Sequence, residues 1–170
     1  MKWIGFVCVI GAMAWIGHEV ATKLAQRPKL IRMLKNALQI FEAEIVYSHA
    51  TIQEACQQIA TQIPDPLSQF FQHVTDRLDK NPDSLYAIWK EEVNNCWQTT
   101  ALMNSEKEII LQFGRTLGQH DIVQQQKYIQ LAQTHLDRKL ADAEEMNHRY
   151  GRMTRSLGFL AGLFIALLLL

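Results

Sequence analysis

Residues 121–157 read DIVQQQKYIQLAQTHLDRKLADAEEMNHRYGRMTRSL, and this stretch decides the fold. Apolar residues return at every seventh position, at Ile122, Ile129, Leu136, Ala143, Tyr150 and Leu157. The repeat predicts one long helix that begins at Asp121, with Gln124 completing its cap, and continues into the apolar C-terminus. Gly151 costs such a helix only about 1 kcal/mol and need not end it. Packing in the core of a helical bundle explains the repeat, and a rigid stalk is the functional alternative.

Three helices are predicted in the first half of the chain, each from a start signal and an amphipathic repeat. The second begins at the capping box Thr51-Ile52-Gln53-Glu54 and runs to about Thr61. The third begins at Asp65-Pro66, a capping carboxylate before a proline at the first helical position. The first begins at Pro28, and its core face consists of Ile31, Leu34, Leu38, Phe41 and Ile45.

Two more helices are predicted before the long one. The fourth follows a turn and cap at residues 81–84, and the fifth begins at the capping box Ser105-Glu106-Lys107-Glu108 and ends near Gly114 or Gly118. The apolar face of the fourth consists of Leu85, Ile88, Trp89, Val93 and Trp97. No strand-like alternation competes with these repeats, so the fold class is all-α, a six-helix bundle large enough for one core.

Both ends of the chain are apolar. Residues 3–17 carry no charge, and residues 157–170 end in Ala-Leu-Leu-Leu-Leu. A membrane span needs about 20 apolar residues, so we expect a transmembrane anchor at 1–22, a cytoplasmic bundle at 23–152 and a short span at 153–170. Ala12-Met13-Ala14 leaves open a cleaved signal peptide, although the apolar run continues past that point and favours an anchor. A helix lying in the interface or buried in a partner is the alternative for the C-terminal segment.

The formal net charge of zero hides a strong asymmetry. Basic residues flank the two apolar segments, namely Lys23, Arg27, Lys29, Arg32, Lys35, Arg149, Arg152 and Arg155. By the positive-inside rule they place the central part in the cytoplasm and both termini outside. Between Asn36 and His148 there are eight Lys or Arg and sixteen Asp or Glu. An acidic body of this kind excludes nucleic acid as an expected partner, because phosphate binding needs a basic face.

Nothing in the sequence points to catalysis. Cys8, Cys56 and Cys96 are widely spaced, which indicates reduced thiols, and the last two are expected to be small buried residues. The six histidines make no metal-ligand spacing, and no nucleophile or phosphate-loop motif occurs. We therefore expect no enzyme activity, cofactor or metal.

The motifs resemble one known family. The string Phe113-Gly114-Arg115-Thr116-Leu117-Gly118-Gln119-His120-Asp121 is similar to stage III sporulation protein AB. The same holds for Gln125-Gln126-Lys127, for residues 157–163, and for the stretch from Arg27-Pro28 to Tyr47. In its cytoplasmic part that family is similar to the inner-membrane platform (F) proteins of type II secretion and type IV pilus machines.

The resemblance implies a six-helix cytoplasmic domain and a place in the channel complex between mother cell and forespore. A non-enzymatic platform would then lie in the mother-cell membrane around the forespore and couple a cytoplasmic ATPase to the membrane assembly. The implied partners are a secretion-type ATPase, other stage III A proteins and membrane lipids, and a homo-oligomer is left open. Platform proteins carry two copies of the domain and three spans, whereas this chain has one copy. A membrane-anchored adaptor or regulator that binds a soluble factor is the alternative function.

The candidate partner-binding residues form three groups. The first is the connection between the fifth and sixth helices, where Gly118 ending one helix and Asp121 capping the next is the purely structural reading. The other two are acidic: a solvated helix surface is the favoured interpretation of both, and contact with a basic ATPase face is the functional alternative. The full set comprises Leu117, Gly118, Asp121, Glu91, Glu92, Asp142, Glu144 and Glu145.

Overall fold

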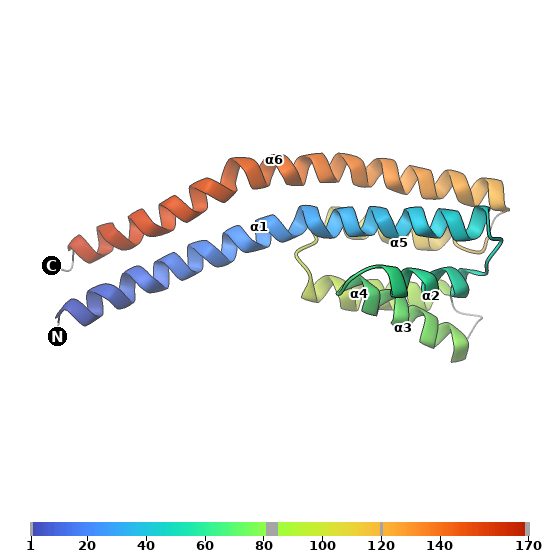
Figure 1. Cartoon of the computed structure of the whole chain (residues 1–170), viewed down its shortest axis with the longest axis horizontal. Coiled ribbons are helices and arrows are strands. Elements are labelled where there is room, and N and C mark those ends of the chain that lie inside the picture. The colour runs from blue at the N-terminus through green and yellow to red at the C-terminus, as the bar shows by residue number, and fades with distance from the viewer. Residues whose placement is uncertain (1, 81–84, 120, 169–170) are drawn as a thin grey trace. The chain divides into compact units, whose positions relative to one another are not determined.

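The protein is all-α throughout the residues that its computed structural model describes, which are 2–80, 85–119 and 121–168. Side chains are described from Ala25 to Tyr150 within these ranges, and at Trp15, Glu19 and Thr22. The predicted fold class is confirmed. The helices are α1 (Lys2–Val46), α2 (Ile52–Gln62), α3 (Leu67–Lys80), α4 (Leu85–Thr99), α5 (Asn104–Thr116) and α6 (Ile122–Leu168) (Figure 1).

The chain divides into two compact units. The larger unit is Lys29–Leu140, which holds α2 to α5 with the second half of α1 and the first part of α6. The smaller unit combines Met1–Pro28 with Ala141–Leu170.

Within the larger unit α1 and α6 run antiparallel, side by side (Figure 1). Three glutamines of α6 hold this pairing because each donates a side-chain hydrogen bond to the carboxylate of Glu42 on α1. The nitrogen–oxygen distances are 3.1 Å for Gln126, 3.0 Å for Gln130 and 3.2 Å for Gln133. Further along the same two helices, Lys35 forms an ion pair with Asp137. These contacts fix the register of the helix pair.

One tryptophan of α4 joins that helix to α3 and α5. Trp89 of α4 is 1% exposed, and its ring makes edge-to-face contacts with Phe70 and Phe71 of α3 and with Phe113 of α5. The ring centroids lie 5.1, 6.1 and 5.9 Å apart, within the range that aromatic pairs prefer. The indole N–H donates to the carbonyl oxygen of Ile110 at 2.9 Å, so this buried polar group is satisfied.

Two predicted helix starts are confirmed. The backbone N–H of Glu54 donates to the hydroxyl of Thr51 at 3.2 Å, and the Glu54 carboxylate accepts from the Thr51 N–H at 2.8 Å, which completes the capping box of α2. Asp121 caps α6 by accepting from the Gln124 N–H at 2.8 Å. Both signals are local side-chain to backbone hydrogen bonds, and such bonds follow directly from sequence.

Three other predicted helix starts need correction or cannot be placed. α1 continues through Pro28 from Lys2, because helix formers on both sides and burial of the helix beyond that point outweigh the cost of one proline. α3 begins at Leu67, and the carboxylate of Asp65 accepts from the side chain of Gln69 instead of capping the helix. The turn predicted at 81–84 lies outside the described residues.

The start of α5 lies before the predicted capping box. Met103 is the cap residue, and the carboxylate of Glu106, not Glu108, reaches back to its backbone N–H at 2.7 Å. Glu106 is fully buried, whereas Glu108 is exposed. Ser105 therefore lies inside the helix, where its hydroxyl donates to Glu106.

The predicted core faces are largely confirmed. All five apolar positions predicted from 31 to 45 are buried, as are four of the five on α4, with Leu85 half-buried. The seven-residue repeat of α6 holds for Ile129, Leu136 and Ala143, which are at most 2% exposed. Ile122 and Tyr150 are each 43% exposed, so the repeat does not extend to the ends of the described stretch.

The described parts of both apolar segments are helical, residues 3–17 in α1 and residues 157–168 in α6. Among the residues that the structure describes, no helix combines the length and the hydropathy needed to cross a membrane. The two expected spans are thus not confirmed. In the smaller unit, Arg27 is one of the basic residues that flank the apolar segments. It is only 6% exposed, and its guanidinium donates to the sulfur of Met146 at 3.6 Å.

Candidate functional site

The α5–α6 connection contains the first group of candidate residues. Gly118 is exposed and has a φ of +72°, the left-handed region that favours glycine, which is the role expected of it after a helix end. Asp121 is exposed and caps α6. Leu117 is only 5% exposed and lies in the core. A partner could therefore reach Gly118 and Asp121, while Leu117 holds the connection against the bundle.

The connection is also held by two other helices. A Cβ atom added to Gly118 would lie 3.3 Å from the side chain of Ile52 on α2 and 3.5 Å from that of Leu85 on α4. The motif that carries the family resemblance thus connects the end of α5 to the start of α6 and lies beside the first residues of α2 and α4.

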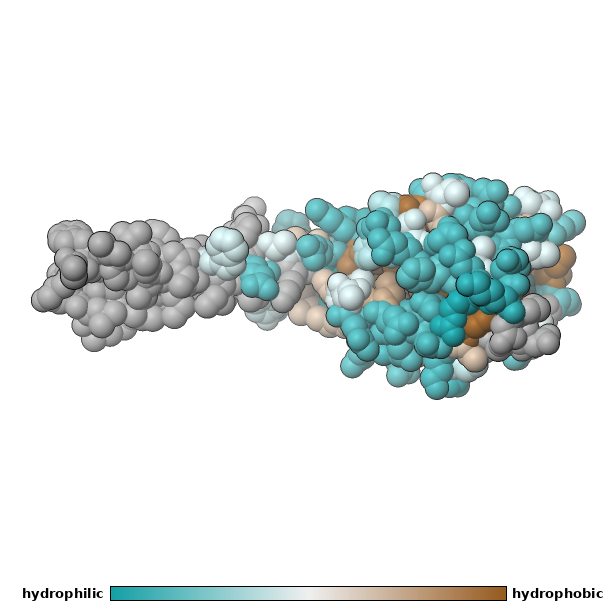
Figure 2. Space-filling model, turned by 90° about the horizontal axis from the view of Figure 1, so that it is seen from below, coloured by the Kyte–Doolittle hydropathy of each residue, from teal (hydrophilic) through white to brown (hydrophobic). Residues whose placement is uncertain are grey.

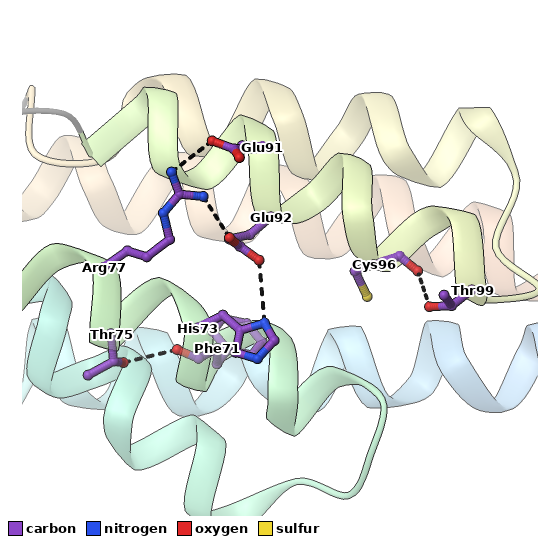
Figure 3. A network of polar contacts seen from close by, with 8 residues as sticks. All are labelled: Phe71, His73, Thr75, Arg77, Glu91, Glu92, Cys96 and Thr99. Atoms are coloured by element: carbon purple, nitrogen blue, oxygen red, sulfur yellow. Dashed lines mark hydrogen bonds and ion pairs between the residues drawn. The ribbon is translucent and has the colours of Figure 1, made fainter.

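Glu91 and Glu92, the second group, are bound by one arginine that sequence reasoning missed (Figure 3). Arg77 of α3 donates from Nη2 to Glu91 Oε2 and from Nη1 to Glu92 Oε1, both at 2.7 Å. The second oxygen of Glu92 lies 3.5 Å from Nδ1 of His73. These charge-assisted bonds lower the pKa of Glu91 and raise the pKa of Arg77.

The two carboxylates differ in their surroundings. The side chain of Glu91 is 58% exposed, whereas that of Glu92 is 8% exposed. The expectation that both belong to a solvated helix surface is wrong for Glu92, because the side chain turns inward between α3 and α4. Only Glu91 is presented to a partner on the open surface.

The third group lies on α6 in the smaller unit. Asp142 and Glu145 are exposed and Glu144 is half-buried. Asp142 and Glu144 each have a polar or electrostatic partner. This group belongs to the smaller unit, whereas Glu91 and the α5–α6 connection belong to the larger unit. A role in binding stays a prediction for all three.

A hollow of about 210 Å³ opens between α3 and α4, beside the arginine and its two glutamates. A signal for it was present in the sequence, because His73 and Arg77 are four residues apart on one helix and Glu92 and Cys96 are four apart on the next. Such pairs lie on one helix face, although the pairing of the two faces is visible only in the fold. The lining residues are Pro66, Gln69, Phe70, His73, Glu92, Asn95, Cys96 and Thr99.

The two described cysteines are poor nucleophiles. Burial raises the pKa of Cys56 to about 12. Burial, with a smaller effect of the Glu92 charge, raises the pKa of the half-buried Cys96 to about 11. A thiol with such a pKa is protonated at neutral pH and lacks the thiolate that attacks substrates or binds metals. Cys56 fulfils the expectation of a small core residue, whereas Cys96 is only partly covered.

Several apolar side chains remain on the surface of the larger unit, which sequence reasoning did not single out. The face shown in Figure 2 is mostly hydrophilic with separate apolar spots. Scattered residues of this kind are normal on soluble surfaces and carry no function by themselves. The exposed set comprises Tyr47, Met103, Ile122, Val123 and Leu131.

Comparison with known proteins agrees with the motifs. The model of the family "Stage III sporulation protein AB" matches residues 2–170. Stage III sporulation protein AB of Bacillus subtilis (strain 168) is 45% identical over 170 residues, which is 100% of this chain and 99% of the relative. A solved structure of stage III sporulation protein AB (SpoIIIAB) is similar with a TM-score of 0.67 and 47% identity, over 72% of this chain and 96% of that one. The chain belongs to the stage III sporulation protein AB family.

Proposed function

We propose that this protein is a non-enzymatic platform in the mother-cell membrane around the forespore. There it would couple a secretion-type cytoplasmic ATPase to a channel complex needed for endospore formation. Membership of the family supports a role in sporulation, and the family is named for a stage of development and not for a reaction. The membrane location, the ATPase partner and the coupling between them go beyond family membership and are our proposal.

One observation carries the proposal. Each apolar terminal segment belongs to the same uninterrupted helix as residues of the bundle core. α1 contains both the uncharged residues 3–17 and the buried Ile31 and Leu34, and α6 contains both the buried Leu136 and the apolar stretch from 157. Pro28 lies inside α1 and lacks a backbone N–H, so it removes one hydrogen bond from that helix without ending it. The terminal segments are therefore joined to the bundle by helix and not by an irregular loop.

Exposed aromatic residues support a membrane location. The side chain of Trp15 is 76% exposed although it lies within the apolar N-terminal segment. Tyr150 is 43% exposed, and the guanidinium of Arg149 lies 5.7 Å from its ring centroid. Tryptophan, tyrosine and arginine are the residues that prefer the boundary between hydrocarbon and headgroups. A lipid bilayer would cover these side chains.

Charge supports a basic partner on the cytoplasmic side. The excess of eight acidic residues between Asn36 and His148 follows from sixteen acidic and eight basic side chains. An acidic body attracts a basic protein face and speeds its association. Among the candidate residues, Glu91 lies on the surface of the larger unit with an exposed carboxylate. Its pKa is lowered, so the carboxylate stays ionised.

Two measurements on sporulating cells test the proposal. The full chain should sediment with membranes, and external protease should cleave the bundle only after the membrane is permeabilised. Capture of the chain from mildly solubilised membranes should recover the secretion-type ATPase and other stage III A proteins. Glu91→Lys should weaken this capture, with Glu108→Lys on α5 as the matched charge reversal that leaves it intact.

The outcomes separate the alternatives. A chain that stays in the supernatant, or a bundle cleaved while the membrane is sealed, excludes the proposed topology. Recovery of a soluble factor without the ATPase supports the adaptor function instead. Equal loss of capture with both charge reversals would show that net charge matters and that the position of Glu91 does not.

A further inference from the structure

We propose that the hollow between α3 and α4 binds the ammonium group of one lysine side chain from a partner protein, with Glu92 as its counter-ion. The inference rests on the proposed function for the identity of that partner, which would be the cytoplasmic ATPase. The site itself follows from the charge, shape and hydrogen bonding of the eight lining residues.

The lining has one formal charge, and that charge is negative. Glu92 is the charged member of the set, and the other polar lining residues are neutral amides, a hydroxyl, a thiol and an imidazole. The carboxylate side chain is 8% exposed, so water screens it poorly and a cation that reaches it gains more than at an open surface. Arg77 is shared between Glu91 and Glu92, so these three side chains together keep one negative charge. We therefore expect the ligand to carry positive charge on a group small enough to enter.

The two oxygens of Glu92 are in different situations (Figure 3). Oε1 accepts a short bond from Arg77, whereas Oε2 lies 3.5 Å from Nδ1 of His73, which is long for a hydrogen bond. Only one oxygen is thus available to a newcomer. A guanidinium group binds best to both oxygens of a carboxylate at once, while an ammonium group is a point charge that needs one. The geometry favours lysine over arginine.

Other groups in the hollow are arranged as acceptors. The amide nitrogen of Gln69 donates to Asp65 at 2.9 Å, and the hydroxyl of Thr99 donates to the carbonyl oxygen of Cys96 at 3.0 Å. Their oxygens remain the groups that a cation can meet. An ammonium has three donors and no acceptor, which suits a site with Glu92 and such neutral oxygens.

The hollow also fits the stem of a lysine. Pro66 and Phe70 line the hollow and give it apolar surface for the methylene groups of a lysine stem. The volume of about 210 Å³ is below the roughly 300–1,000 Å³ typical of sites for small molecules. A single side chain therefore matches the space better than a cofactor.

Titration of the full-length chain in detergent micelles with short blocked peptides tests the site. The probe is acetyl-Gly-Lys-Gly-amide, in which the lysine ammonium is the one charge, followed by NMR shifts of Gln69, Asn95 and Cys96. We expect saturable shifts that weaken as salt is raised. The norleucine peptide, which keeps the stem and lacks the charge, should not shift these signals, and the arginine peptide should bind more weakly.

Paired variants connect the shifts to Glu92. Glu92→Gln should weaken lysine-peptide binding about tenfold or more, because a hydrogen bond to a charged group becomes a neutral one. Glu91→Gln is the control, since it removes the other carboxylate of Arg77 and does not line the hollow. Asn95→Trp places a large side chain at an exposed position of the lining and should abolish binding even if Glu92→Gln is poorly folded.

The site is overturned if the norleucine peptide shifts the same signals, if arginine binds as well as lysine, or if the two glutamine variants behave alike. A second arm uses the purified ATPase. Binding of the ATPase that survives Asn95→Trp rejects the pocket and keeps the proposed function. Lysine-peptide binding without any ATPase binding keeps the pocket and rejects the proposed partner.

Discussion

The indole ring of Trp89 lies directly over Gly114, so closely that a Cβ atom on Gly114 would come within 3.0 Å of three ring atoms. Real Cβ atoms essentially never approach other atoms so closely. Only glycine therefore leaves room for the ring at position 114. The two residues together set the distance between α4 and α5 at this point.

Gly114→Ala should destabilise the protein by about 1–3 kcal/mol, the usual cost of an overpacked core. Ala is the better helix former, so a loss in α5 would have to come from the clash with Trp89. Chemical unfolding of the purified chain measures the loss, and Gln112→Ala on the exposed face of the same helix is the control. Stability equal to that of the control would mean that the ring moves aside freely.

Gly118→Val should cost about 1–2 kcal/mol, because the residue has a φ of +72° and a β-branched side chain is strained there. Gly118→Asn is the matched control, since asparagine tolerates the left-handed region. Thermal unfolding should rank the wild type above the asparagine variant, and the asparagine variant above the valine variant. If the two variants melt together, strain is not the reason for the glycine.

Arg77→Met should destabilise the protein more than Glu91→Gln does. Methionine at position 77 leaves the buried Glu92 carboxylate without its arginine partner, whereas glutamine at position 91 removes only the charge of an exposed carboxylate. The double change Arg77→Met with Glu92→Gln should regain part of the stability, because the uncompensated charge is gone. Urea unfolding measures this double-mutant cycle, with the wild type, the single variants at 77 and 92 and the double variant. Additive losses of stability would show that Arg77 and Glu92 act independently.

Acid should weaken the start of α2. Hydrogen bonds from the Thr51 backbone and then from its hydroxyl lower the pKa of Glu54 below the ordinary 4.5. The ionised carboxylate therefore stabilises the fold above the unfolded pKa, and this contribution is lost as the pH falls below 4.5 through the folded value. Glu54→Gln keeps a side chain that can reach Thr51 and cannot titrate. Unfolding at about pH 6 and about pH 3, on either side of the ordinary carboxyl pKa, should show a smaller acid loss for the glutamine variant than for the wild type. Identical losses would contradict the assignment.

Thiol reactivity should report unfolding. The pKa values of about 12 for Cys56 and about 11 for Cys96 leave almost no thiolate near neutral pH. In a Cys8→Ser background, alkylation by iodoacetamide should be slow in buffer and fast in denaturant, with the half-buried Cys96 ahead of the buried Cys56. Cys96→Ser and Cys56→Ser identify each signal. Rapid labelling of Cys56 in buffer would contradict its place in the core.

Sequence reasoning succeeded where the structural cause is local. The caps at Thr51 and Asp121 involve residues three positions apart, and the core face of α1 follows from spacing alone. It failed at α5, where Glu106 and Glu108 both offer a carboxylate at capping distance. The fully buried Glu106 completes the cap because of its tertiary surroundings, which no local pattern contains.

The candidate site shows the same division. Gly118 and Asp121 have the local roles that their sequence predicts. Arg77 could not be found, because its two partners lie 14 and 15 residues away on another helix. The inward turn of Glu92 has the same origin: two adjacent glutamates look equivalent in sequence, and only the approach of α3 makes one of them internal.

The hydrogen bonds between Glu42 and the three glutamines have a consequence for alignment under load. Gln126, Gln130 and Gln133 are uncharged, so their bonds to the Glu42 carboxylate act only at contact distance. A slide of α6 by one turn would replace matched donors with residues that cannot all donate to Glu42. The helix pair therefore resists sliding, because a shift by one turn gives up hydrogen bonds that the native register makes.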